Sequence, residues 1–512
     1  MPEHLRSLVY ILILASLFFA FSQRFACVIS NKSDFARRRN LWFGLTLAAF
    51  LAHSFWIYVV VTIPLLLFSN RHEPNPPALF FSVLLVLPMA IVQIPGMGLI
   101  NYIFDLSHAR LLSLFILLPA FFSLLTRSDT ARFGRSGSDK ALAAYLLLMV
   151  VLFFREANLT STMRQIFYIF IDVFLPYFVV SRSLRSMQDF RDALLSLVLA
   201  IMVLAPLAVF ESYKSWLLYS SLTEVLGVEE GMTKYLARDG LLRVIVTAGQ
   251  PIVLGYLMAV GMGLYLFLQH SIKQNGVRRL GFALLTAGLI APVSRGPWIG
   301  AAIMFIVFIA TGPFALRRLA SLALAAMIAL PLVAMLPGGE RVINLLPFIG
   351  TTEKGGIDYR EQLITNSLIV IQRNPWFGSD DFLNTPEMEA MRQGEGIIDI
   401  VNHYIGITLK TGVVGLGLFV AFFGITLLGI YRAMRSIPDR TSEERLLGRV
   451  LLATLLAILT IIFTVSSIAY IPIVYWCVAG IGVAYAQMMR KRANDLPSSN
   501  PQFKTGDPLQ YP

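Results

Sequence analysis

Three arginines stand where hydrophilic segments of the chain meet long apolar runs, namely Arg243, Arg295 and Arg360. A guanidinium group can bind two phosphate oxygens at once, and such a contact strengthens in the low dielectric near lipid. Charged residues at membrane depth are costly and tend to be functional. We therefore expect these arginines to be able to bind phosphate groups. The alternative is that each one reaches lipid headgroups or pairs with a local acid, as Arg360 could with Asp358 or Glu361.

Three further side chains could act as a general base, namely Glu395, Asp399 and His403. A histidine with a pKa near neutrality, or an ionised carboxylate, can remove a proton from a sugar hydroxyl. Glu395 and Asp399 are four residues apart and would share one face of a helix. The alternatives are an interfacial polar histidine and a solvated acidic edge.

These acids and His403 lie in residues 337–410, the one long hydrophilic segment in an otherwise apolar sequence. The break contains aromatic and turn residues that a spacer would not need, so we interpret it as a folded domain on the membrane surface. Within it, Leu363, Ile364, Leu368 and Ile371 recur at helical spacing. This pattern predicts a helix that lies on the membrane surface.

The composition is that of an integral membrane protein, with 56% hydrophobic and only 14% charged residues. The net charge is +12, but the basic residues lie between apolar runs, so no nucleic-acid partner is expected. Cys27 and Cys477 are far apart and have no metal-type spacing. Nucleotide, zinc and serine-hydrolase motifs are absent from the sequence. We expect no metal and no cofactor, and a donor that arrives already activated, such as a lipid-linked diphosphate.

The apolar runs predict an all-α polytopic membrane protein. A helix needs about 20 apolar residues to cross a bilayer core, somewhat fewer where charged ends reach the interface. We expect about 12–14 transmembrane helices, with a large extracytoplasmic loop between the last groups of helices. Alternating segments typical of a membrane barrel are absent, so we exclude strands. The expected spans are 8–21, 41–69, 78–97, 110–126, 141–154, 165–181, 192–210, 248–269, 279–293, 297–313, 319–336, 411–433, 449–467 and 470–488.

Five regions follow from these spans. They are N-terminal transmembrane helices at 1–210, a central transmembrane region at 211–336 with an outer loop at 211–246, the large loop at 337–410, C-terminal transmembrane helices at 411–490, and a tail at 491–512. The tail is rich in polar residues and proline, with little to bury, so we expect it to be disordered in the cytoplasm.

The distribution of basic residues sets the orientation. The breaks at 127–140, 182–191, around 279, 317–318, 435–449 and 489–492 are basic, which places them in the cytoplasm and the large loop in the periplasm or cell exterior. One basic break does not follow the positive-inside rule, because FARRRN at 35–40 falls on the outer side if 41–69 is a single span. A hairpin of two short helices within 41–69 would be the alternative.

Segments between residues 200 and 430 resemble the O-antigen ligase and Wzy-type polymerase superfamily. The similar stretches are Arg243 followed by GQPIVLGYL, then SRGPWIGAA, then REQL and NPWFGSDDF, and finally NHYIGITLKTGVVGL. The resemblance implies a metal-independent, inverting transfer of a glycan from an undecaprenyl-diphosphate donor to a hydroxyl acceptor, at the periplasmic face of a bacterial inner membrane. Arg243, Arg295 and Arg360 would take the roles of the family's diphosphate-binding arginines. The implied partners are the lipid-linked oligosaccharide, the bilayer, and a chain-length regulator or export complex.

One departure from the family pattern concerns the base. Ligases typically carry a His-Asn pair in the final motif, but Val401 stands here at the histidine position, Asn402 at the asparagine, and His403 one residue later. This mismatch favours a polymerase of exopolysaccharide or O-antigen repeats, with a ligase and a polytopic transporter or flippase as alternatives. A transporter would be expected to show pseudo-repeated halves, which we do not find. We rank Glu395 first as the base, His403 second and Asp399 third.

Overall fold

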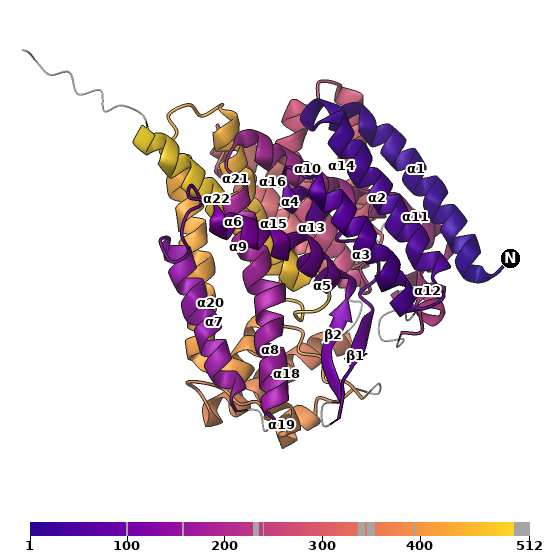
Figure 1. Ribbon diagram of the computed structural model, residues 1–512. Helices are drawn as coiled ribbons and strands as arrows, with labels where there is room; N and C mark the ends of the chain where they lie inside the picture. Colours follow the sequence, from indigo (N-terminus) through magenta and orange to yellow (C-terminus); the bar gives the residue numbers. More distant parts are fainter. Residues whose placement is uncertain are drawn as a thin grey trace, which may run out of the picture.

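The computed structural model describes residues 1–98, 101–155, 158–228, 235–238, 240–335, 344–345, 354–393 and 396–495. Glu395, much of the segment 337–353 and the tail from 496 lie outside the described residues. Helices make up most of the described chain, and Figure 1 shows them packed side by side in a bundle.

The first half of the chain, to the outer break after α11, forms helices, two π-helical turns and one hairpin. The elements are α1 (Glu3–Ile29), α2 (Lys32–Leu51), α3 (Phe55–Arg71), α4 (Pro76–Val83), β1 (Ile91–Pro95), β2 (Tyr102–Ser107), α5 (His108–Leu112), η1 (Ser113–Leu117), α6 (Leu118–Thr126), α7 (Gly137–Phe153), α8 (Leu159–Ile169), η2 (Phe170–Phe174), α9 (Leu175–Ser183), α10 (Met187–Met202) and α11 (Leu204–Lys214).

The second half carries the remaining helices and a very short hairpin. Its elements are α12 (Ser220–Leu226), β3 (Ala237–Arg238), β4 (Leu241–Leu242), α13 (Pro251–Leu268), η3 (Gln269–Ser271), α14 (Asn275–Ile290), α15 (Arg295–Ala310), α16 (Ala315–Met335), α18 (Lys354–Arg373), η4 (Phe382–Asn384), α19 (Pro386–Glu389), α20 (His403–Arg435), α21 (Glu443–Ile461) and α22 (Ile471–Asp495).

The all-α polytopic membrane class is confirmed. Within the described chain, seven helical stretches are long and apolar enough to cross a membrane, and α3 and α15 are shorter apolar helices. The seven are Glu3–Ile29, His108–Thr126, Leu159–Ser183, Met187–Lys214, Pro251–Ser271, His403–Arg435 and Ile471–Asp495. The total of about 12–14 spanning helices stays a prediction.

The predicted span 78–97 is wrong, and so is the exclusion of strands. Helix α4 ends at Val83, and β1 then pairs with β2 in an antiparallel hairpin. Pro88 and Pro95 interrupt this apolar run. Because proline lacks a backbone N–H and clashes with the preceding turn, a helix cannot run through them without a kink or break. Hydropathy alone did not register these two prolines.

The basic breaks gather at one end of the bundle. Four ion pairs hold them together, and each joins residues of different helices or of the breaks between them: Arg182 with Asp139, Arg185 with Asp129, Arg191 with Glu443, and Arg492 with Glu444. In Figure 1 this end lies at the top, whereas α18, α19 and the β1–β2 hairpin lie at the bottom. We call these the basic end and the loop end.

The run 41–69 is a hairpin of two helices, as the alternative interpretation held. Helix α2 ends at Leu51 and α3 begins at Phe55, where the Ser54 hydroxyl accepts a hydrogen bond from the Trp56 N–H. The FARRRN segment therefore starts α2 and lies at the basic end, where Arg38 pairs with Asp192 at 2.7 Å. Because 41–69 forms two helices and not one span, the FARRRN segment lies on the same side as the other basic breaks. The segment therefore no longer violates the positive-inside rule.

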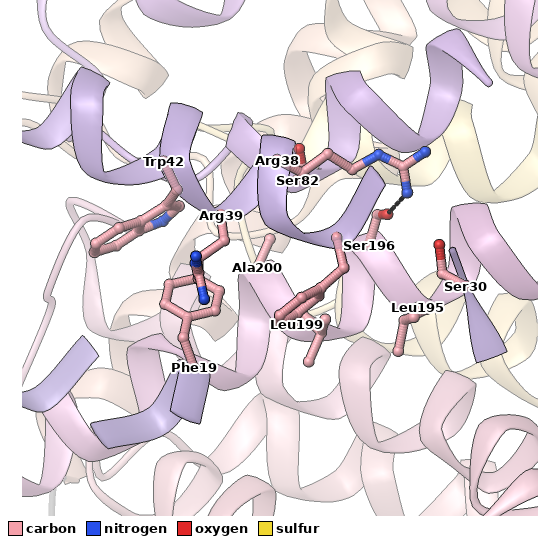
Figure 2. Close-up of a pocket in the computed structure, with 11 residues that line it drawn as sticks. Phe19, Ser30, Arg38, Arg39, Trp42, Ser82, Leu195, Ser196, Leu199 and Ala200 are labelled. Carbon is pink, nitrogen blue, oxygen red and sulfur yellow. Dashed lines mark hydrogen bonds between the residues drawn. The ribbon is translucent and has the colours of Figure 1, made fainter. Parts of the chain in front are cut away.

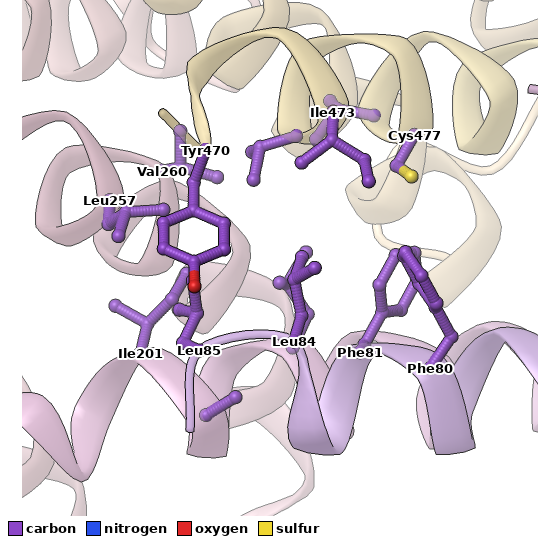
Figure 3. Packing of buried hydrophobic residues seen from close by; sticks show 14 of the residues in the cluster. Phe80, Phe81, Leu84, Leu85, Ile201, Leu257, Val260, Tyr470, Ile473 and Cys477 are labelled. Carbon is purple, nitrogen blue, oxygen red and sulfur yellow. The ribbon is translucent and has the colours of Figure 1, made fainter. Parts of the chain in front are cut away.

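The centre of the bundle is α13, whose side chains are nearly all buried. Figure 3 shows Tyr470, just before α22, with its ring beside Leu257 of α13 and its hydroxyl directed toward Leu85, which follows α4. The Tyr470 hydroxyl donates a hydrogen bond to the Leu87 carbonyl. This contact satisfies a backbone carbonyl in the non-helical stretch after α4, which would otherwise be costly inside the bundle. The chain leading to the β1–β2 hairpin is thereby fixed in the core.

Candidate functional site at the loop end

Three arginines meet at the turn between α14 and α15. The Arg243 Nη2 donates to the Ser294 Oγ at 3.1 Å, and the Arg238 Nη1 donates to the Val293 carbonyl at 2.8 Å. Arg295 is the next residue and the first of α15. We call Arg238, Arg243 and Arg295 the arginine cluster. It brings together two of the three predicted phosphate ligands and adds Arg238, which the sequence analysis missed.

A short hairpin carries two members of this cluster. Strands β3 and β4 pair Arg238 with Leu241, and the Arg243 N–H closes the hairpin on the Leu236 carbonyl at 2.8 Å. The turn includes Gly240 with a φ of 75°, a conformation that glycine adopts without steric cost. The hairpin therefore carries both Arg238 and Arg243.

Backbone strain marks the same place. Val246, three residues after Arg243, has a φ of 47°, and Val293, two residues before Arg295, has a φ of 49°. A β-branched residue in the left-handed region is a clear outlier, costing of order 1–3 kcal/mol. Such strain persists only where the surroundings impose it, and it clusters at functional sites. Both valines border the arginine cluster.

Glu211 stabilises the loop that contains the strained residue Val246. Its side chain is fully buried and accepts hydrogen bonds from the backbone N–H groups of Leu218 at 2.9 Å, Ile245 at 3.2 Å and Val246 at 3.0 Å. A buried carboxylate needs such donors to remain stable. Glu211 thus anchors both ends of the outer break that carries Arg238 and Arg243. In the sequence, Glu211 is recognisable only as the first residue of the outer break.

Arg295 connects the cluster to the large loop. Its Nε donates to the Leu345 carbonyl at 3.0 Å and its Nη2 to the Asn344 carbonyl at 2.8 Å. The side chain is half-buried, and it orients two main-chain carbonyls that follow α16. Arg295 is therefore held at the entrance of the loop and does not simply extend to the lipid surface.

The connection between α21 and α22 contacts both the start of α15 and the segment that carries Asp399 and His403. A Cβ added at Gly296 would come within 2.3 Å of the Thr464 Oγ1, so this connection touches the start of α15. Two residues on, the Ser466 hydroxyl donates to the Asp399 Oδ1 at 2.5 Å. The His403 N–H donates to the Ile462 carbonyl at 3.0 Å. The segment 399–403 and the start of α15 thus both contact this connection.

The predicted bases differ in their surroundings. His403 begins α20, half-buried, with its ring centre 5.3 Å from that of Phe419 and its Nε2 3.3 Å from the Tyr475 hydroxyl. Asp399 is also half-buried, and its backbone carbonyl accepts a hydrogen bond from the Tyr359 hydroxyl at 2.9 Å. Glu395 lies outside the described residues.

Asn402, the asparagine of the final motif, has a structural role. Its side chain caps α20 by accepting hydrogen bonds from the Tyr404 N–H at 3.0 Å and the Ile405 N–H at 3.2 Å. An N-terminal cap of this kind satisfies donors that have no partner inside the helix. The cap fixes where α20 begins and therefore where His403 points.

Arg360 is exposed on α18 in the large loop. Its neighbour Tyr359 is the residue that bonds the Asp399 carbonyl. The third predicted phosphate ligand is thus carried by the helix whose Tyr359 contacts the base segment.

Helix α18 has one buried and one exposed apolar face. Leu363 and Val370 are buried in a small core of the loop, together with Phe382, Met388, Met391 and Leu409. Ile364 is 46% exposed and Leu368 is 52% exposed. The helix predicted from Leu363, Ile364, Leu368 and Ile371 is present, and only part of its apolar face packs against protein.

The NPWFG and KTGVV stretches pack on each other. Gly412 breaks α20 with a φ of 68°, and a Cβ there would lie 2.2 Å from the Trp376 carbonyl. Gly378 faces it with a φ of 64°, and its Cβ would lie 2.4 Å from the Leu409 carbonyl. Arg155, at the end of α7, braces the turn by donating to the Phe377 carbonyl at 3.0 Å. These motif glycines allow the two backbones to approach closely. In the sequence, the only sign of this contact is the presence of the two glycines.

The fold and this end of the bundle define a multi-pass helical membrane protein with clustered arginines beneath a folded loop. Residues 280–420 match the family model Wzy_C, described as O-antigen ligase. This match supports the O-antigen ligase and Wzy-type superfamily for the chain, and with it a membrane enzyme of the ligase or polymerase type. The matched segment includes Arg295, Arg360, Asp399 and His403 but not Arg243, and it is narrower than the resemblance at 200–430. No curated protein matches the chain.

Proposed function

We propose that the protein is a polysaccharide polymerase. It transfers a glycan from an undecaprenyl-diphosphate donor to a hydroxyl of an acceptor repeat unit, in exopolysaccharide or O-antigen biosynthesis. The observation that carries this proposal is the arginine cluster at the turn before α15, within reach of the loop that holds the predicted bases. The cluster lies at the loop end, and the positive-inside rule favours the periplasm for that end because the basic breaks lie at the other.

The arginines suit the leaving group of this transfer. The bond between the anomeric carbon and the phosphate oxygen breaks, and the acceptor oxygen forms the new bond to that carbon from the opposite face. The departing diphosphate gains negative charge, which positioned guanidinium groups stabilise more than they stabilise the donor itself. Arg243 and Arg295 are already oriented by protein contacts, so little reorganisation would be needed.

The acceptor hydroxyl must lose its proton as it attacks. The segment 395–403 supplies the three candidate bases. We rank Glu395 first, His403 second and Asp399 third. Asp399 is held by Ser466 and Tyr359 contacts, which supports a fixed position near the α21–α22 connection. His403 stands among aromatic rings, which supports a packing role beside a catalytic one.

A ligase is the second candidate, because the matching family model is described as O-antigen ligase. A polymerase and a ligase differ in the acceptor. A polymerase extends lipid-linked repeats, whereas a ligase transfers a finished glycan to a different lipid. A chain-length regulator or export complex would be a partner only for the polymerase. Val401 at the position of the ligase histidine favours the polymerase.

Purified protein and a lipid-diphosphate repeat unit would test the proposal. We expect longer oligomers from the parent protein, and a loss of about 10²–10³ in rate for Arg295→Ala or Arg243→Ala. The lysine variants should recover only part of this loss, because a point charge lacks the planar fork. Arg440→Ala, at the basic end, is the matched control. Parent-like oligomers from both alanine variants would rule out phosphate binding by the cluster, and transfer only to a different acceptor lipid would favour the ligase.

The same assay tests the base. Glu395→Gln is the main variant because it preserves shape while removing the proton acceptor, and a base of this kind contributes about 10²–10⁴ in rate. Asp399→Asn and His403→Gln extend the comparison, and Arg360→Ala tests the third arginine. If none of the three base variants slows oligomer formation, the acceptor site lies in another part of the loop end.

A further inference from the structure

A cavity opens at the basic end, far along the helices from the arginine cluster. It is a small, partly open pocket between α1, α2, α4 and α10, and its empty space of about 380 Å³ includes open solvent. Figure 2 shows its lining, which includes Phe19, Arg39, Trp42, Ser196, Leu199 and Ala200. Most of the lining surface is apolar, and the charged groups come only from α2.

Arg39 differs from its two neighbours in its partners. Arg37 pairs with Asp34 and Glu73, and Arg38 pairs with Glu73 and Asp192. Arg39 donates only to the side-chain oxygen of Asn40, at 3.2 and 3.0 Å, in the part of the chain that the structure describes. A guanidinium has five N–H donors, so Arg39 retains donors for an anion from outside the protein.

The polarity of α2 changes at Arg39. Its first residues read KSDFARRRN, and the helix continues as LWFGLTLAAF. The helix therefore passes from the interface into the hydrocarbon region just after Arg39. Trp42, Phe19 and Leu199 line the cavity as apolar side chains, and hydroxyl groups such as that of Ser196 stand with Arg38 near its polar side.

We propose that this cavity binds an anionic phospholipid of the surrounding bilayer. The phosphodiester would accept hydrogen bonds from Arg39, and one acyl chain would approach the apolar opening of the cavity, which Phe19, Trp42 and Leu199 line. Basic pockets between transmembrane helices near the cytoplasmic face suit such headgroups, and the arginine fork fits phosphate oxygens. Exposed apolar residues of α1, such as Leu17 and Val28, are suited to contact with the bilayer that would supply the lipid. This proposal does not depend on the transferase activity.

Lipid binding can be measured on the full-length protein in detergent. Native mass spectrometry would count bound phosphatidylglycerol and phosphatidylcholine with identical chains at equal concentrations. We expect phosphatidylglycerol to be retained preferentially, and Arg39→Gln to weaken it about fivefold, the effect of one interfacial arginine. Arg440→Gln is the matched control, since it removes the same charge at the same end of the molecule but away from the cavity.

Three further outcomes decide between this site and its alternatives. Ala200→Phe fills the apolar part and should also weaken phosphatidylglycerol, while its unfolding midpoint shows whether the bundle is intact. Equal losses in Arg39→Gln and Arg440→Gln, or equal retention of both lipids by the parent protein, would overturn the proposal. Displacement of the lipid by glycerol phosphate at the same concentration would mean that the site recognises a soluble phosphate and not a bilayer lipid.

Discussion

Substitution of Gly412 by alanine should uncouple the large loop from α20. The residue has a φ of 68° and a ψ of −172°, a region essentially restricted to glycine. A Cβ would lie 2.2 Å from both the carbonyl carbon and the oxygen of Trp376, so the NPWFG turn would have to move. That movement breaks the hydrogen bonds from the Val413 N–H to Pro375 at 2.8 Å and from the Val414 N–H to Trp376 at 3.3 Å.

The expected destabilisation follows from these contacts. Backbone strain of this kind costs about 1–3 kcal/mol. The two hydrogen bonds contribute about 0.5–1.5 kcal/mol each. Together they give a loss of about 2–6 kcal/mol, a large part of the 5–15 kcal/mol that typically separates folded and unfolded states. Because α20 begins at His403, one of the predicted bases, we also expect lower transferase activity.

Gly417 is the matched control, because it lies in the same helix and a Cβ there would meet no atom within 4 Å. Its replacement by alanine should be neutral or stabilising by up to about 1 kcal/mol. Unfolding midpoints of both variants in one detergent, with protease cleavage within the loop, would measure the difference. Equal midpoints and equal cleavage for Gly412→Ala and Gly417→Ala would refute the claim that close backbone packing holds the loop.

Three other predictions concern the rest of the molecule. Glu211→Gln should lower stability by about 1–3 kcal/mol, measured as an unfolding midpoint, and reduce activity, because an amide cannot accept from all three N–H groups that the carboxylate serves. In a cysteine-free background, an impermeant maleimide applied to intact cells should label a cysteine at Glu395 but not at Arg440, and the reverse pattern would invert the topology. Arg373 lowers the pKa of Glu387 from its usual 4.5, so their pairing should stabilise the α18–α19 contact above pH 4.5 and be lost below it as the carboxyl is protonated. Loop proteolysis followed from pH 7 to 4 should therefore rise only near the acidic limit, and Arg373→Gln should remove that rise.

The sequence by itself determined the class of the protein and most of its helices. Apolar runs of about 20 residues cannot remain in water and must satisfy their own backbone in lipid, so composition and hydropathy are sufficient. The arginines before apolar helices were also visible, because a charge beside a span is costly and stands out. The motif stretches around Arg295 and Gly412 carried the family resemblance that the match at 280–420 supports.

Only the tertiary structure decided how these pieces meet. Hydropathy is a property of a single segment, so it could not separate the α2–α3 hairpin from one long span, nor register the break after α4. Nor could it show that Glu211 holds a loop more than 30 residues away in sequence, with Ile245 34 residues along the chain. The arginine cluster depends on the β3–β4 hairpin and the turn before α15 being neighbours in space. Such contacts between distant segments are set by packing and by hydrogen bonds to buried groups, which no local pattern in the sequence records.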